Sequence, residues 1–219
     1  MDTGSLIHGL LLFVAFIAFV TLHEFAHAWT AVKCGDDTPR LQGRLTIDPI
    51  AHIDIIGTIA LPLLAVVVGA FAGQSLIFGW GRPVMVNLDN FRRRQLDDIL
   101  VSGAGPAMNV LIAVGLLVLI KAMEGFVDRE YLDAVLNLAR FSLFLCFFNL
   151  LPIPPLDGGH IMRNLIGMSD ETYRMLSQYS FMALLLVMQS PQVGKFVVLV
   201  TDSALELLAR PFGWTISIG

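Results

Sequence analysis

The feature that most limits how this chain can fold is an uncharged apolar run near its amino terminus. Between Leu6 and Leu22 there is no Asp, Glu, Lys or Arg. A run of this kind approaches the roughly 20 apolar residues that a helix needs to cross a bilayer. The whole chain of 219 residues is 56% hydrophobic and only 15% charged, which is too apolar for a soluble domain of this size. We therefore expect an integral membrane protein.

Two histidines and a glutamate follow this run directly, in the pattern His23-Glu24-x-x-His27. On a helix, positions i and i+4 are neighbours on one face, so both imidazoles can reach one metal ion. This is the spacing of zinc ligands, and a carboxylate beside zinc can take a proton from a water whose pKa the metal lowers to about 7. A chance occurrence is disfavoured, because a charge at the centre of a membrane helix costs roughly 2.5–3.5 kcal/mol. His23 and His27 are therefore candidate zinc ligands, and Glu24 is the candidate general base.

Six apolar segments alternate with polar loops along the chain. The first four are long enough to cross about 30 Å of hydrocarbon, whereas the last two are short for a crossing. The short pair would form two tilted spans or a helical hairpin broken at Ser190-Pro191. The segments are Ser5–Val32, Ile55–Phe78, Leu100–Ile120, Ala134–Leu151, Tyr173–Met188 and Val193–Leu208.

This pattern predicts an all-α polytopic membrane protein with five to six membrane helices and a short β or re-entrant element. We expect one domain over residues 1–219. Its core would cover about residues 5–165, followed by a C-terminal helical pair at about residues 173–210.

A zinc site needs a third protein ligand, and the best candidate is Asp157. It follows the fourth apolar segment within Asn149–His160, a stretch that contains three prolines and two glycines. Those residues break the helix, so the backbone can turn a carboxylate inward. The alternative is an ordinary interfacial turn with a solvated Asp157. His160 follows closely enough to compete as a ligand, but a hydrogen-bonding role beside the ligands is favoured.

The two parts of this site constrain the topology, because His27 lies near the end of the first segment and Asp157 lies just after the fourth. Both ends must face the same side of the membrane if they bind one metal ion. Segment Ile55–Phe78 is therefore expected to be re-entrant or a returning hairpin rather than a complete crossing. That arrangement places ten Lys and Arg residues on one side and four on the other, whereas a full crossing divides them seven and seven. The positive-inside rule then puts the site on the cytosolic side of the cell membrane.

The loop Gly79–Asn87 has the β-branched, glycine and proline content of a short extended segment. An edge strand there could pair with the backbone of a substrate. In another loop, His52 is expected to be hydrogen-bonded to a neighbouring group rather than to act with Asp54 as a gate or metal contact. The residues of the edge strand would be Val84, Met85, Val86 and Asn87.

Three motifs in this order resemble the site-2 protease family of intramembrane zinc metalloproteases. They are His23-Glu24-x-x-His27, the stretch Ser102–Asn109, and Asn149–Gly159 with its Leu156-Asp157-Gly158. Two further stretches look like the compact bacterial members that carry no PDZ or CBS domain: Gly43-Arg44-Leu45-Thr46 with Pro49-x-x-His52-x-Asp54, and Gly79–Asn87. The resemblance covers about residues 20–165.

The resemblance implies a three-helix core that holds one zinc ion per chain through His23, His27 and Asp157, with Glu24 as general base and acid. It also implies that Asn149 lies near the site and positions the scissile peptide or the oxyanion. Asn109 would support the site from behind the ligands or pack between helices.

The predicted function is hydrolysis of peptide bonds in membrane-spanning proteins, within or near the bilayer. The partners would be a transmembrane substrate and the lipid bilayer. A net charge of −4, with Arg92-Arg93-Arg94 as the longest basic run, argues against nucleic-acid binding. One alternative is a divalent-cation transporter, which would need several weak sites in series, and another is an inactive binder of membrane proteins. The sequence indicates neither the substrate nor the oligomeric state.

Overall fold

Helices make up all the regular structure in the part of the chain that the computed structural model describes, which is residues 3–72, 79–180, 182, 184, 186 and 189–214. Within these residues, three helices are long and apolar enough to cross a membrane: α1 (Thr3–Cys34), α4 (Arg94–Met123) and α5 (Arg129–Asn149). At 1.5 Å per residue, each exceeds the roughly 30 Å thickness of the hydrocarbon. The prediction of an all-helical membrane protein is confirmed, while five to six spans around a three-helix core stays a prediction.

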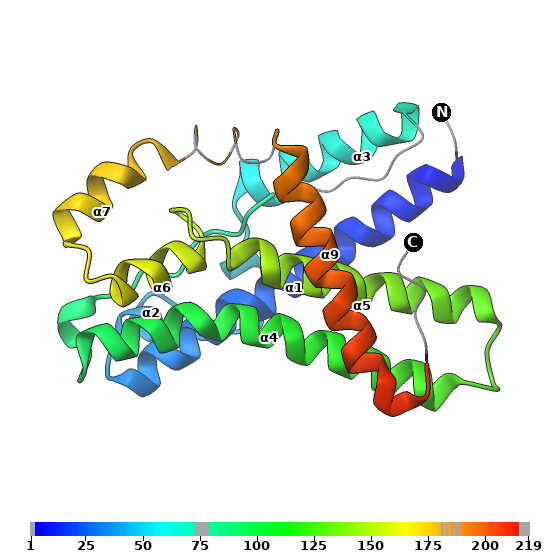
Figure 1. Ribbon diagram of the computed structural model, residues 1–219, viewed down its shortest axis with the longest axis horizontal. Helices are drawn as coiled ribbons and strands as arrows, with labels where there is room; N and C mark the ends of the chain where they lie inside the picture. The colour runs from blue at the N-terminus through cyan, green and yellow to red at the C-terminus, as the bar shows by residue number, and fades with distance from the viewer. Residues whose placement is uncertain are drawn as a thin grey trace. The chain divides into compact units, whose positions relative to one another are not determined.

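The chain divides into two compact units, residues 1–92 and residues 93–219. In the first unit, the long helix α1 packs against α3 (Leu61–Ala72), and the two helices are drawn in blue and cyan in Figure 1. Short helical turns connect them. These are α2 (Thr38–Leu41), a 3-10 turn at Pro49–Ala51 and a π-helical turn at Ile55–Ala60. A further 3-10 turn, at Leu88–Asn90, comes after α3.

A buried carboxylate fixes the loops at the end of α1. The helix ends at Cys34, and Gly35 follows with φ of 111°, a left-handed conformation that favours glycine. The next residue, Asp36, is fully buried and accepts hydrogen bonds from the Thr38 hydroxyl at 2.5 Å and the Asn87 N–H at 2.7 Å. It also accepts one from the Asn90 side chain at 2.8 Å. Burial alone would raise the pKa of Asp36, but these hydrogen bonds outweigh it and hold that pKa below its ordinary value.

The segment expected to re-enter the membrane begins as an apolar helix over Ile55–Phe71, which is shorter than the three candidate spans. Residues 73–78 lie outside the described part of the chain, so its re-entrant course stays a prediction. The following loop, Gly79–Asn87, has no regular secondary structure, and no strand occurs among the described residues. The short strand predicted at Val84–Asn87 therefore finds no pairing partner within the described chain.

In the second unit, α4 and α5 lie side by side, with α6 (Asp157–Leu165) packed on α4 and α9 (Pro191–Ala209) packed across α5 (Figure 1). A helix α7 (Asp170–Ser177) follows α6, and a 3-10 turn at Arg210–Phe212 follows α9. Small and branched apolar residues let α4, α5 and α9 approach closely. The buried residues of this core are Ala113, Leu117, Ile120, Ala139, Leu143, Leu205 and Ala209.

Polar side chains also link these helices. The Ser142 hydroxyl on α5 donates to the Asn109 carbonyl on α4 at 2.8 Å. Arg140 on α5 pairs with Asp202 on α9 at 3.0 Å, and Asp202 is buried. The α9 helix begins at Pro191, which is where the hairpin alternative placed its break. Proline suits the first position of a helix, because the N–H it lacks would have no partner there.

Candidate metal centre

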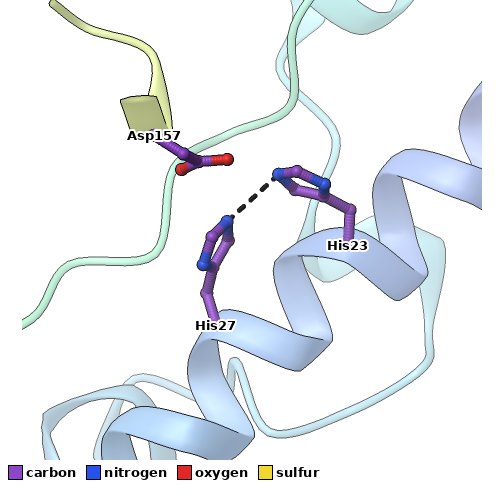
Figure 2. A group of neighbouring side chains, drawn as sticks. All are labelled: His23, His27 and Asp157. Atoms are coloured by element: carbon purple, nitrogen blue, oxygen red, sulfur yellow. Dashed lines mark hydrogen bonds between the residues drawn. The ribbon is translucent and has the colours of Figure 1, made fainter. Parts of the chain in front are cut away.

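His23 and His27 lie one helical turn apart on α1, and both side chains are buried. Their imidazoles point toward each other, with the two Nε2 atoms 3.0 Å apart (Figure 2). Two nitrogens that each bind one tetrahedral zinc at about 2.0–2.1 Å would lie about 3.3 Å apart. The histidine pair therefore fits the spacing that a shared metal ion requires, as the i and i+4 pattern predicted.

Three alanines close to this pair on α1 are buried. Ala26 is 6% exposed, and Ala28 and Ala31 are fully buried. Alanine allows the backbone of α1 to be approached closely and also favours the helix that sets the two histidines in register.

Glu24 lies on the same turn of α1 and is half-buried. Its Oε2 atom accepts a hydrogen bond from the backbone N–H of Val84 at 3.1 Å. The loop comes close enough that a Cβ atom on Gly81 would meet the Val20 side chain at 2.5 Å and Glu24 Cγ at 3.4 Å. The carboxylate is thus held by the backbone of Gly79–Asn87, a contact that sequence reasoning did not find.

Asp157 belongs to the second unit, where it is the first residue of α6 and is half-buried (Figure 2). The two glycines after it are required by packing. A Cβ atom on Gly158 would collide with the Leu150 carbonyl, and one on Gly159 would lie 2.7 Å from the Pro154 nitrogen. The expected break in the helix is confirmed, because α5 ends at Asn149 and α6 begins at Asp157. The role of Asp157 as third ligand stays a prediction.

The other candidates in this unit lie on three different helices. Asn149 is the last residue of α5, and its Nδ2 donates to the Leu145 carbonyl at 2.8 Å. Asn109 is buried on α4. His160 lies on α6 with Nδ1 at 3.8 Å from Asp98 Oδ1, and its ring centroid is 4.9 Å from that of Tyr173. Burial raises the pKa of the Tyr173 phenol to about 12.

The loop candidates separate into different roles. Val84 contacts Glu24, whereas Met85 is 61% exposed. Val86 is half-buried. The Asn87 side chain accepts from the Asp89 N–H at 3.1 Å and caps the 3-10 turn after it. Pairing of these four residues with a substrate stays a prediction.

His52 and Asp54 have different hydrogen-bond partners. His52 is buried, and its Nε2 lies 2.8 Å from the Thr46 carbonyl oxygen. Asp54 instead accepts from the N–H groups of Ile56 and Gly57 at 3.1 and 2.7 Å, which caps the turn at Ile55–Ala60. The expectation of a loop histidine bonded to a neighbouring group agrees with this arrangement.

Sequence reasoning assigned no role to Arg44, which the structure places close to Glu24. Arg44 is 4% exposed, and its guanidinium donates to the carbonyls of Ala51 and, at 3.0 Å, Pro83. Burial and the charge of Arg82 lower the pKa of Arg44 from its ordinary value, whereas Glu24 acts in the opposite direction. The stretch Gly43-Arg44-Leu45-Thr46, which the family resemblance includes, was the signal in the sequence that could have identified it.

Known proteins resemble this chain in sequence. The model described as "Peptidase family M50" matches residues 126–188. "Putative zinc metalloprotease YwhC" of Bacillus subtilis is 40% identical over 195 residues, which cover 85% of this chain and 83% of that protein. "Putative zinc metalloprotease Rip2" of Mycolicibacterium smegmatis is 29% identical over 190 residues, which cover 85% and 70%. No solved structure is a significant match. The chain therefore belongs to peptidase family M50, the site-2 protease family, and is a zinc metalloprotease.

Proposed function

We propose that this metalloprotease is an intramembrane endopeptidase that cleaves membrane-spanning proteins within or near the bilayer. The observation that carries the proposal is the pair of buried imidazoles, with a glutamate on the same turn, in a helix long and apolar enough to span a membrane. In this proposal residues 1–219 act as one protease domain in the cell membrane.

The donor set proposed for the metal consists of His23, His27 and Asp157, which supply two imidazole nitrogens and a carboxylate oxygen for one zinc ion per chain. Two histidines with a carboxylate form a common ligand set of catalytic zinc. When bound, zinc acts as a Lewis acid and makes water acidic enough to be deprotonated at neutral pH.

Glu24 is the proposed general base and acid. Its carboxylate takes a proton from the attacking water and then gives it to the amine of the departing peptide. The hydrogen bond from Val84 to Oε2 restricts the orientation of this carboxylate. Asn149 is proposed to position the scissile peptide or the oxyanion, and Asn109 and His160 are proposed to support the site.

A transmembrane substrate hides its carbonyls in helical hydrogen bonds, so it must be locally unwound before hydrolysis. The segment Val84–Asn87 is proposed to pair with the unwound substrate backbone. This segment has no regular secondary structure, and it begins at the residue that contacts Glu24. Substrate pairing there would bring the scissile bond beside the proposed base.

The catalytic site is proposed to face the cytosol. The support is the distribution of basic residues, with ten on the side of the site and four on the other when residues 55–78 return to the same face. Cysteine-accessibility labelling at Ser75 and Asn87 tests this topology. Labelling from opposite sides of the membrane would contradict it.

Cleavage of a single-span substrate by purified protein tests the activity. Glu24→Gln should retain zinc and lose cleavage, whereas Asp157→Ala should lose both. A zinc chelator should stop cleavage by the unaltered protein. Full cleavage by Glu24→Gln would remove the proposed base, and full zinc content in Asp157→Ala would remove the proposed third ligand.

A further inference from the structure

The motif Gly43-Arg44-Leu45-Thr46 takes no part in the chemistry above, yet the structure connects it to Glu24 through one peptide group. That group joins Pro83 to Val84. Its carbonyl accepts from Arg44 Nη2 at 3.0 Å, and its N–H donates to Glu24 Oε2 at 3.1 Å. A cation and an anion are therefore bound to the two ends of a single peptide unit.

This peptide is trans, so its C=O and N–H point in opposite directions within one plane. The positive guanidinium withdraws electron density at the oxygen, and the negative carboxylate attracts the N–H at the other end. Both charges polarise the peptide in the same sense, which strengthens each hydrogen bond. Arg44 also donates to the Ala51 carbonyl, which fixes the guanidinium from a second direction.

We call residues 80–84 the strap. The strap is also held by hydrogen bonds at residues that come before Pro83. The Arg82 N–H donates to the His52 carbonyl at 2.8 Å, and the Trp80 N–H donates to the Gly57 carbonyl at 3.1 Å. The Thr58 hydroxyl donates to the Trp80 carbonyl at 2.8 Å. Loop 44–58 thus holds the strap at several points.

The opposite face of the strap lies on α1. A methyl group on Gly81 would meet the branched side chain of Val20 at 2.5 Å, one helical turn before Glu24. The strap is therefore held between the loop that contains Arg44 and the helix that carries the proposed base.

We propose that Arg44 is a positioning residue for the hydrolytic reaction. It holds the Pro83–Val84 peptide so that the Val84 N–H fixes Oε2 of Glu24 and leaves Oε1 to transfer the proton. This inference rests on the proposed function in one respect, namely that Glu24 is the general base. Small displacements of a catalytic group cost up to about a hundredfold in rate, so loss of Arg44 should lower kcat strongly.

The test compares Arg44→Ala and Arg44→Lys with Arg40→Ala in the full-length, zinc-loaded protein. Arg40 is the matched control, because it lies close to Arg44 in sequence, on α2, and its ion pair with Asp37 is exposed. Four quantities are measured: kcat and KM on a single-span substrate, zinc content, and hydrogen exchange of peptides that cover the strap.

Arg44→Ala should lower kcat by about tenfold to a hundredfold. Zinc content and KM should stay near those of the unaltered protein, and hydrogen exchange of the strap should become faster. Arg44→Lys should show a smaller loss, because lysine keeps the charge but lacks the planar fork that binds two carbonyls. Added guanidinium should restore part of kcat in Arg44→Ala. Arg40→Ala should match the unaltered protein in all four quantities.

Glu24→Gln separates this inference from the proposed function. Glutamine keeps an acceptor oxygen for Val84, so the exchange of the strap should not change although cleavage is lost. If Glu24→Gln cleaves at the normal rate, the proposed function fails. A different result overturns the positioning role alone. In that result Glu24→Gln is inactive, and one of the Arg44 variants has normal kcat although hydrogen exchange of the strap is faster. Arg44→Ala with normal exchange and normal kcat also overturns it.

Discussion

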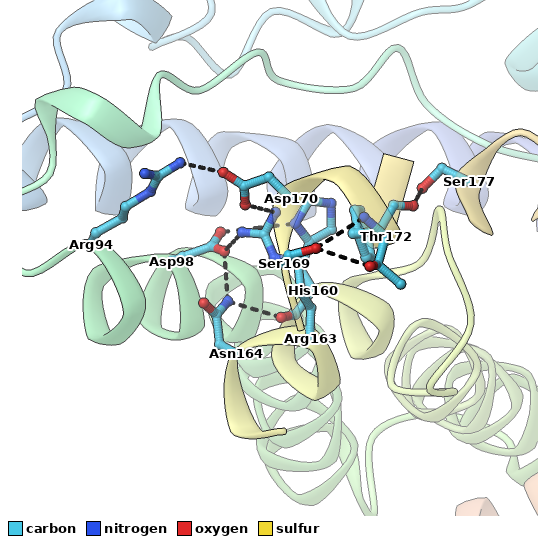
Figure 3. A network of polar contacts seen from close by, with 10 residues as sticks. Arg94, Asp98, His160, Arg163, Asn164, Ser169, Asp170, Thr172 and Ser177 are labelled. Carbon is cyan, nitrogen blue, oxygen red and sulfur yellow. Dashed lines mark hydrogen bonds and ion pairs between the residues drawn. The ribbon is translucent and has the colours of Figure 1, made fainter. Parts of the chain in front are cut away.

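Asp98 on α4 and Arg163 on α6 form an ion pair whose two side chains are both buried. Asp98 also accepts a hydrogen bond from Asn164 Nδ2 at 2.6 Å, and Arg163 lies 3.4 Å from Asp170 (Figure 3). Because α6 begins at Asp157, this pair fixes the helix that carries the proposed third zinc ligand.

Removal of one partner from this pair should destabilise the protein. Asp98→Ala leaves a buried guanidinium without its main counterion, which costs about 3–5 kcal/mol in unfolding free energy. Arg94→Ala is the control, because Arg94 pairs with Asp170 at 2.5 Å on the surface and such pairs contribute less than about 1 kcal/mol. Denaturant unfolding in detergent micelles measures both. Equal losses in the two variants would show that burial of the Asp98 pair has no special effect.

Loss of a histidine ligand should remove the metal as well as the activity. His27→Ala leaves one imidazole on α1, so zinc content should fall to a small fraction of normal, and added zinc should not restore cleavage. His8→Ala is the matched control, since His8 is an exposed histidine on the same helix. Atomic emission measures the zinc in both proteins. A normal zinc content in His27→Ala would place the metal elsewhere.

The buried carboxylate of Asp36 should make stability depend on acidic pH. Its pKa in the folded protein is lower than in the unfolded chain. The stabilisation is therefore present above the unfolded pKa of about 3.9 and is lost as pH falls through the folded pKa. Asp36→Asn should reduce stability by about 1–3 kcal/mol at neutral pH, because buried hydrogen-bonding groups lose an acceptor, and should flatten the acid dependence. Unfolding curves between about pH 3 and pH 7 measure the effect.

Asp37→Asn is the control for this measurement, because the neighbouring Asp37 is exposed and forms a surface ion pair with Arg40. Its stability should follow that of the unaltered protein within about 1 kcal/mol at each pH. The same acid dependence in Asp36→Asn and in the unaltered protein would exclude Asp36 as its source.

The ion pair between Arg140 and Asp202 should attach α9 to α5. Asp202→Ala leaves Arg140 uncompensated inside an apolar helix, so stability in detergent should fall. The exchanged pair Arg140→Asp with Asp202→Arg should recover part of the loss, because the attraction is restored. Glu206→Ala serves as the control, because it removes a more exposed ion pair, between α9 and Arg210 in the turn that follows. A double variant no more stable than the two single variants predict together would argue against direct pairing.

Features governed by local periodicity could be predicted from the sequence. The i and i+4 spacing placed His23 and His27 beside each other, and the apolar runs located α1, α4 and α5. The prolines and glycines of Asn149–Gly159 located the break between α5 and α6. Each of these depends on residues close together in sequence, where helix geometry and backbone chemistry decide the outcome.

Contacts between distant residues could not be predicted in the same way. Glu24 and Val84 are 60 positions apart, and Asp98 and Arg163 are 65 positions apart. No helical period or local sequence pattern relates residues so far apart. The short strand at Val84–Asn87 was predicted from composition, but a strand requires a partner, and composition does not provide one. The hydrogen bond of Val84 goes instead to a side chain.

The glycines after Asp157 have a mechanical consequence. Gly158 lies directly against the carbonyl of Leu150, so the end of α5 and the start of α6 meet backbone to backbone without a side chain between them. A side chain at this contact would overlap the backbone of Leu150 and force the two helix ends apart. Residues 151–156 thus form a tight corner, so the direction in which α5 ends constrains the position of the Asp157 backbone.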